Sequence, residues 1–190
     1  LIPLLKKYVD LKVLCSGTNR QLELSFPIDF QLKGISFSYN KTGGLSYWQT
    51  LQKAKLLEFQ KEVKQLDLRS YDLILNDFEP VSAYAAQKND LPIIGLSHQA
   101  AFLSPLTPRG SKKNPMAEWV FRHYAPVKRA IGFHFQAYDT FIKGPILRSG
   151  IGVSKGNNLK IVVYLPAYSG KFLKNYLRQI PEREWLIFSK

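Results

Sequence analysis

The feature that most constrains the fold of this chain is the stretch of residues 70–102, SYDLILNDFEPVSAYAAQKNDLPIIGLSHQAAF. Two apolar runs, residues 71–75 and 92–96, enclose a run of small apolar residues at 81–87 that begins just after Pro80. Proline suits the first turn of a helix, because the backbone N–H that it lacks has no helical partner there. The order strand, polar turn, short helix, strand predicts one parallel crossover unit. Because the apolar runs do not alternate, we expect both strands to be buried on both faces.

Polar residues cluster directly after each of the two apolar runs. The first group is Asn76, Asp77 and Glu79, and the second is Ser97, His98 and Gln99. In open parallel sheets, ligands bind at the carboxyl ends of the strands. The stretch therefore predicts a binding site as well as a fold, with both groups facing one pocket if the two strands are neighbours.

The bulk composition fits a globular protein with a substantial core. A chain of 190 residues with 45% hydrophobic residues has room for one domain, or for one domain and part of another. No apolar run is long enough to cross a bilayer, and no signal peptide is visible. The single cysteine, Cys15, makes no intrachain disulfide, which favours a cytoplasmic protein.

The net charge of +13 is high for this length. It could indicate nucleic acid, an anionic membrane surface, a phosphorylated substrate or simply a solvated basic surface. The basic residues are spread along the chain, with no long basic arm and no RNA-binding signature, which argues against nucleic acid as a partner. The loop that contains Arg109, Lys112 and Lys113 could touch an anionic lipid surface or acceptor, with a solvated loop as the alternative.

The residues before the central stretch predict further elements of an α/β fold. Residues 1–8 have the pattern of the end of an amphipathic helix, 11–15 and 34–39 those of strands, and 47–66 that of a long helix. A doubly wound domain begins with a strand and a glycine-rich loop. We therefore expect that first strand to precede Leu1, so that the chain is a fragment.

The residues after the central stretch predict a loop and then a second domain. Residues 103–114 have the composition of an exposed loop, and 115–124 that of a helix that buries Met116, Trp119 and Val120. Residues 131–136 and 145–148 are expected to be extended. The glycine-rich residues 150–158 predict a linker, after which 159–165, 171–179 and 184–188 repeat the order strand, helix, strand. The predicted domains are thus 1–149 and the beginning of another at 159–190.

Four segments together resemble a family of bacterial glycosyltransferase-like proteins with the GT-B fold: YDLILNDFEPVSAYAA, LPIIGLSHQAAF, APVKRAIGFHF and KIVVYLPAYSGKFLKNYLRQIPEREWLIFSK. That family is related in architecture to the lipid-linked N-acetylglucosaminyl transferases and the UDP-glycosyltransferases. The resemblance implies two Rossmann-like domains, an N-terminal one that binds the acceptor and a C-terminal one that binds a nucleotide-sugar donor. It also implies an acceptor that could be anionic or lipid-linked, and contact with the inner face of the membrane. The donor-binding half lies outside the chain, so we expect the fragment alone to be inactive.

Glycosyl transfer of this kind needs a base that takes the proton from the acceptor hydroxyl. Candidate bases are Asp77, Glu79 and His98. Each has a structural alternative. Asp77 could cap the helix, and Glu79 could place its negative charge in the first helical turn, where such a charge is favourable. His98 could make a structural hydrogen bond. The three histidines are scattered without metal-ligand spacing, so no metal or other cofactor is expected beside the nucleotide sugar.

Further candidate residues lie after other strands of the predicted sheet. Asn19 and Arg20 follow the first strand and, with Asn76, Ser97 and Gln99, are the candidate acceptor-binding residues. Arg20 could pair with an anionic acceptor, or make a surface ion pair. His134 lies in an apolar strand, which favours a structural histidine.

Three other functions remain open at this point. A non-catalytic sugar- or nucleotide-binding module and a different GT-B enzyme, such as a sugar epimerase, would share the scaffold. A nucleic-acid binder is motivated by the charge alone.

Overall fold

A computed structural model describes residues 1–17, 24–38, 46, 50, 54–110, 114–147, 150, 160–165 and 168–189. The chain divides into a larger unit, Leu1–Ile35 with Lys55–Leu147, and a smaller unit, Ser36–Ala54 with Arg148–Lys190. Helices are interspersed with strands, and every strand pair among the described residues is parallel. The predicted α/β class with a mostly parallel, Rossmann-like sheet is therefore confirmed, whereas the predicted domain boundaries stay a prediction.

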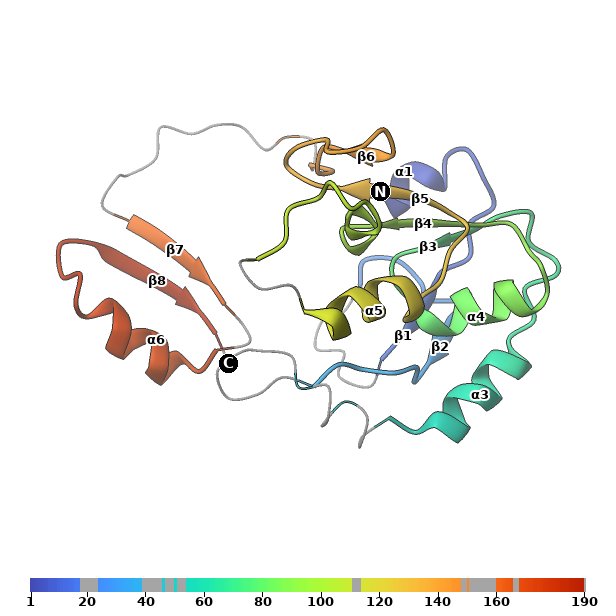
Figure 1. The fold of residues 1–190 in the computed structure, drawn as a ribbon, viewed down its shortest axis with the longest axis horizontal. Helices are drawn as coiled ribbons and strands as arrows, with labels where there is room; N and C mark the ends of the chain where they lie inside the picture. Colours follow the sequence, from blue (N-terminus) through green and yellow to red (C-terminus); the bar gives the residue numbers. More distant parts are fainter. Residues whose placement is uncertain are drawn as a thin grey trace. The chain divides into compact units, whose positions relative to one another are not determined.

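The larger unit contains a four-stranded sheet in the order β3-β4-β5-β6 (Figure 1). Its strands are β3 (Ile74–Asn76), β4 (Ile93–Ser97), β5 (Arg129–Phe133) and β6 (Ile142–Lys143). A separate parallel pair joins β1 (Leu14–Ser16) to β2 (Phe30–Leu32). Because β3 and β4 are neighbours, the two polar groups that follow them lie at the same edge of one sheet.

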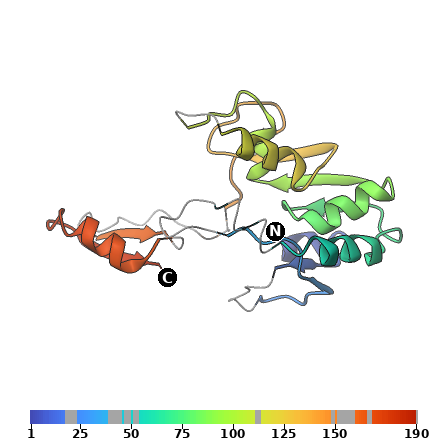
Figure 2. The ribbon, with the colours of Figure 1, turned by 60° about the horizontal axis from the view of Figure 1, so that its bottom comes forward.

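The helices of the larger unit are α1 (Ile2–Leu5), α3 (Leu56–Gln65), α4 (Pro80–Lys88), the 3₁₀ helix η1 (Gln99–Leu103) and α5 (Pro115–His123). Helix α4 lies in the core, where Val81, Ala83, Ala85 and Ala86 are fully buried. Helix α3 lies beside α4 in both views (Figures 1 and 2), with the ring edge of Phe59 directed at Tyr84 at 5.7 Å. The small side chains of α4 allow this close packing against its neighbours.

The smaller unit contains the parallel pair β7 (Lys160–Tyr164) and β8 (Glu184–Phe188), joined through α6 (Gly170–Leu177). The predicted strand–helix–strand order at this end of the chain is therefore confirmed. Ser169 caps α6 by accepting the backbone N–H of Phe172 at 3.3 Å. No helix in the described ranges is long and apolar enough to cross a membrane.

The expectation that both strands are buried on both faces is wrong for β3. Burial alternates along β3, where Leu75 keeps 40% of its surface exposed between two buried residues. Along β4 no residue is exposed, since Ile94 and Leu96 are half-buried between buried residues. One face of β3 is therefore open, whereas both faces of β4 are at least partly covered.

Two predictions near the amino end are wrong. No strand forms in residues 34–38, because Gly34 has a φ of +57° and its N–H, like that of Lys33, binds the carboxylate of Glu62 instead of a neighbouring strand. The helix expected at 47–66 is interrupted, since Thr50 is helical but Ala54 and Lys55 are not, and α3 covers only Leu56–Gln65. Most of residues 47–53 lie outside the described part of the chain.

The loop after η1 is exposed in places, as at Leu106, but it is also anchored in its described part, residues 103–110. Ser104 and Thr107 are almost fully buried, and the Ser104 hydroxyl donates to Asp139 at 2.8 Å. Arg109 donates to the Glu118 carboxylate at 2.7 Å and to the carbonyl oxygens of three residues, Phe102, Ser104 and Thr107. Arg109 therefore holds this loop in place, while residues 111–113 lie outside the described ranges.

Helix α5 buries a narrower face than predicted. Val120 is buried, but Met116 and Trp119 are about half exposed, and the Trp119 ring stacks on His123 at 5.1 Å. A helix pattern does not say which apolar residues meet a partner. Residues 145–147, expected to be extended, form no strand, and β6 precedes them. Of the predicted linker, only Gly150 is described.

Candidate functional site

The edge of the sheet beyond β3 is built around the buried side chain of Asn76, which is 2% exposed. Its Nδ2 donates to the carbonyl of Glu79 at 2.7 Å and to the hydroxyl of Ser82 at 2.9 Å. Its Oδ1 accepts the N–H of Glu79 at 3.1 Å. Asn76, predicted as an acceptor-binding residue, thus closes the turn between β3 and α4.

Glu79 is the N-cap of α4. Its Oε1 accepts the N–H of Val81 at 2.8 Å, and its Oε2 accepts both the N–H and the hydroxyl of Ser82 at 2.6 Å. Pro80 follows at the first helical position, as predicted. The alternative prediction that Asp77 caps this helix is therefore wrong. Both carboxylate oxygens of Glu79 are engaged in the capping hydrogen bonds.

Asp77 projects from the same turn and makes no hydrogen bond to another described residue. Asp77 is exposed as a residue, but nearby protein atoms exclude part of the water around its carboxyl. This desolvation raises the pKa of the carboxyl. The charge of His98 opposes this and lowers the same pKa. Asp77 and His98, which sequence analysis assigned to the same edge, therefore interact electrostatically.

His98 directly follows β4 and is exposed. Its Nδ1 lies 2.9 Å from the carbonyl oxygen of Phe133 at the end of β5. A carbonyl can only accept a hydrogen bond, so Nδ1 carries the hydrogen in this contact. In the neutral ring, the lone pair is then on Nε2, where it is available to take a proton.

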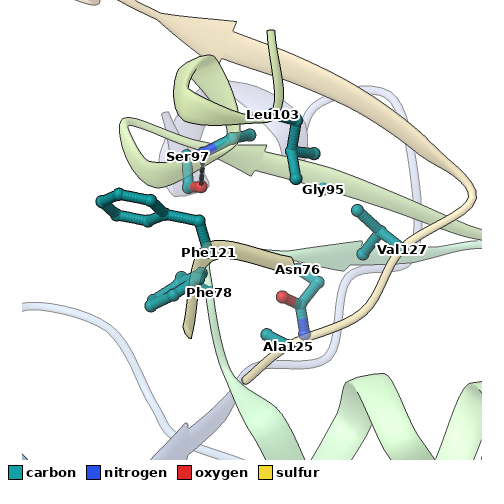
Figure 3. Close-up of a pocket in the computed structure, with 9 residues that line it drawn as sticks. Asn76, Phe78, Gly95, Ser97, Leu103, Phe121, Ala125 and Val127 are labelled. Carbon is teal, nitrogen blue, oxygen red and sulfur yellow. Dashed lines mark hydrogen bonds between the residues drawn. The ribbon is translucent and has the colours of Figure 1, made fainter. Parts of the chain in front are cut away.

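Ser97, the last residue of β4, lines a small pocket (Figure 3). The hydroxyl of buried Ser97 accepts the N–H of Ala100 at 3.0 Å, and Gln99 begins η1 with a partly buried side chain. The cavity volume of the pocket is only about 10 Å³, which is at the lower limit for a single water molecule. Its lining is mostly apolar: Asn76, Phe78, Gly95, Ser97, Ala100, Leu103, Phe121, Ala125 and Val127.

Asn19 and Arg20 lie outside the described residues. His134 follows β5 directly, with the ring of Tyr138 5.1 Å away and its Nδ1 facing the N–H of Gln136 at 3.4 Å. These contacts fit the structural role predicted for it. The described part of the chain holds no group of three histidine, cysteine, aspartate or glutamate side chains that could bind a metal ion.

Two features of the edge were missed by sequence reasoning. The carbonyl of Phe133 orients His98 from 35 residues away, and a backbone atom leaves no residue-type signal. Phe78 has a positive φ, although phenylalanine carries no sequence signal for that conformation. The role of Ser82 could have been suspected, because a polar residue shortly after a helix start often takes part in capping.

The parallel α/β architecture, with polar and ionisable side chains at the carboxyl ends of neighbouring strands, defines a Rossmann-like ligand-binding protein. The chain matches the family model described as glycosyl transferase family 1 over residues 1–189, and it belongs to that family. Membership confirms the resemblance and supports glycosyl transfer in general, with a sugar donor and an acceptor as substrates. A search of curated proteins and a search of solved structures found no match to the chain.

Proposed function

We propose that this protein transfers a sugar from a nucleotide-sugar donor to an acceptor hydroxyl, without a metal ion, and that His98 is the base. The observation that carries the proposal is that Asp77 and His98 follow the neighbouring parallel strands β3 and β4, with the charge of His98 lowering the pKa of the Asp77 carboxyl. Nε2 of His98 takes the hydroxyl proton while the oxygen attacks the anomeric carbon of the sugar, whose bond to the diphosphate oxygen breaks and releases the nucleoside diphosphate. Positioned proton transfer of this kind accelerates a reaction by about 10²–10⁴-fold.

Asp77 has a separate role in this proposal. When Nε2 takes the proton, the imidazole ring becomes a cation, and a carboxylate nearby stabilises that cation. The hydrogen bond from Nδ1 to the Phe133 carbonyl holds the ring in the required orientation throughout. Glu79 remains the third candidate base, but the occupation of both its oxygens favours the other two.

The acceptor is proposed to bind along the same edge. Ser97 and Gln99 border it on the β4 side, and Asn19 and Arg20 follow β1 in sequence. Under this proposal, residues 1–149 are the acceptor-side domain, 150–158 a linker and 159–190 the start of the donor-side domain. An anionic or lipid-linked acceptor would fit the net charge of +13 and would bring the protein to a membrane surface.

The test is release of nucleoside diphosphate from a panel of UDP-, GDP- and dTDP-sugars. It is run on residues 1–190 and on the product of the complete coding sequence side by side. We expect His98→Gln to lower turnover by about 10²–10⁴-fold. His123→Gln is the matched control, since His123 is exposed and its Nδ1 also lies 2.9 Å from a backbone carbonyl.

The outcomes separate the proposals clearly. Turnover that survives His98→Gln would remove His98 as the base. Binding of a nucleotide sugar, measured by calorimetry, without any turnover would instead favour a non-catalytic recognition module on the same scaffold.

A further inference from the structure

The 3₁₀ helix η1 packs directly against β5, at a contact that leaves no room for a side chain. A Cβ added to Gly132 would lie 2.6 Å from both the Cα and the N of Ala101, and 3.1 Å from the carbonyl carbon of Ala100. These are main-chain atoms, so they cannot turn aside as the end of a flexible side chain could. The backbone of Gly132 is not left-handed, so glycine is needed here for space rather than for conformation.

A buried hydroxyl also holds η1 in this place. Thr107 is 2% exposed, and its Oγ1 donates to the carbonyl oxygen of Ala101 at 2.6 Å. Ala101 itself has no exposed surface. The middle of η1 therefore has two attachments, the close contact with Gly132 on β5 and the bond from Thr107 in the loop that follows.

The position of η1 decides where the ring of His98 lies. His98 directly precedes η1, and its carbonyl accepts the N–H of Ala101 at 3.1 Å. The strand register pairs Ser97 with Gly132. The next residues along the two strands are His98 and Phe133, and Nδ1 of His98 lies 2.9 Å from the Phe133 carbonyl oxygen. The close contact at Gly132 is therefore one residue away from the bond that orients the ring.

We propose that Gly132 and Thr107 are positioning residues for His98. By holding η1 in place they keep Nδ1 bonded to the Phe133 carbonyl, so that the lone pair of the neutral ring stays on Nε2. The inference rests on the proposed function, because it concerns the orientation of the proposed base. A side chain at position 132 would push η1 and β5 apart, and loss of the Thr107 hydroxyl would release the carbonyl of Ala101. In both cases the ring loses its fixed bond, and its hydrogen is no longer confined to Nδ1.

The experiment observes the ring of His98 directly and needs no substrate. Nitrogen NMR of the imidazole, at about pH 8.5 where histidine rings are mostly neutral, distinguishes a hydrogen on Nδ1 from one on Nε2. The chain has three histidines, and His98→Gln identifies the signals of His98 by their disappearance. The unchanged protein should show a single form of this ring, with the hydrogen on Nδ1.

Two changes should abolish this single form. In Gly132→Ala the new Cβ meets the backbone of η1, and in Thr107→Val the hydroxyl is lost while the shape of the side chain is kept. Each should give a mixture of the two ring forms. Thr107→Ser keeps the hydroxyl and should keep the single form. Gly144→Ala should also keep it, because Gly144 has open space around it.

His123 is the control within each spectrum, since its Nδ1 lies 2.9 Å from the Trp119 carbonyl, in a contact within α5 itself. Its signals should be the same in every variant. A single Nδ1–H form of His98 in folded Gly132→Ala, or in Thr107→Val, overturns the inference. So does a change that His123 shares, because it would mean a general loosening of the fold. If Gly132→Ala fails to fold, Thr107→Val and Thr107→Ser decide alone.

The NMR result is independent of the transfer assay, so the two proposals can fail separately. If the ring form of His98 depends on Gly132 and Thr107 as expected while His98→Gln retains full turnover, the proposed function fails and the inference stands. If His98→Gln abolishes turnover while the ring form is the same in all variants, the inference fails and the proposed function stands.

Discussion

Two carboxylates that flank Phe78 are expected to affect stability in opposite directions. Replacing Glu79 by alanine removes the cap of α4 and leaves the N–H groups of Val81 and Ser82 without their acceptors. Loss of a cap costs about 1 kcal/mol, and a buried N–H left unpaired costs a further ~1–3 kcal/mol. Since Val81 is fully buried, we expect Glu79→Ala to lower the free energy of unfolding by about 2–4 kcal/mol.

Replacing Asp77 by asparagine should stabilise the protein at neutral pH. Burial raises the pKa of the Asp77 carboxyl, so the folded chain binds the proton more tightly than the unfolded chain does. The free energy of unfolding therefore falls as the pH rises from the ordinary pKa to the raised one. Asp77→Asn removes this loss, and its benefit should vanish in acid, where the carboxyl is protonated in both states.

The assay is urea unfolding at pH 7 and at pH 3, followed by circular dichroism. With a urea dependence of about 2 kcal/mol per M, Glu79→Ala should move the midpoint down by roughly 1–2 M. Glu58→Ala is the control, because Glu58 is an exposed carboxylate that pairs with two lysines. The reasoning is refuted if Glu79→Ala costs no more than Glu58→Ala, or if Asp77→Asn destabilises at pH 7.

Three further predictions concern the packing around the site. Arg109→Lys should lower the unfolding free energy by about 2–3 kcal/mol, because lysine cannot reproduce the several bonds of the 16% exposed guanidinium; no change in the urea midpoint would contradict this. Gly132→Ala should lower the unfolding free energy by at least ~2 kcal/mol, since its new Cβ would lie 2.6 Å from backbone atoms of η1. Gly144→Ala is the control and should leave the urea midpoint unchanged, because Gly144 has open space around it. Ser104→Ala should raise the pKa of Asp139, because the Ser104 hydroxyl lowers it together with Thr140. It should therefore remove part of the stability that Asp139 contributes above its ordinary pKa and loses as the pH falls, and an unchanged carboxyl titration would refute this.

Local sequence signals predicted the elements that depend on neighbouring residues. Pro80 and the small residues after it placed α4, and the apolar runs placed β3, β4, β7 and β8 to within a few residues. These elements carry their signals in propensity and in runs of hydrophobic residues. The failed predictions lie where a distant partner decides, such as Glu62, which binds the backbone at Lys33 and Gly34 where a strand was expected.

The sequence by itself therefore determined the fold class and the two groups of polar residues at one edge of the sheet. It could not say which carboxylate caps α4, because Asp77 and Glu79 both occur at the helix start, and hydrogen-bond geometry assigns the cap to Glu79. Nor could it orient His98, whose partner is a backbone carbonyl on the next strand. Strand pairing, which arises only when the whole unit packs, decided that the residues after β3 and those after β4 lie at the same edge of one sheet.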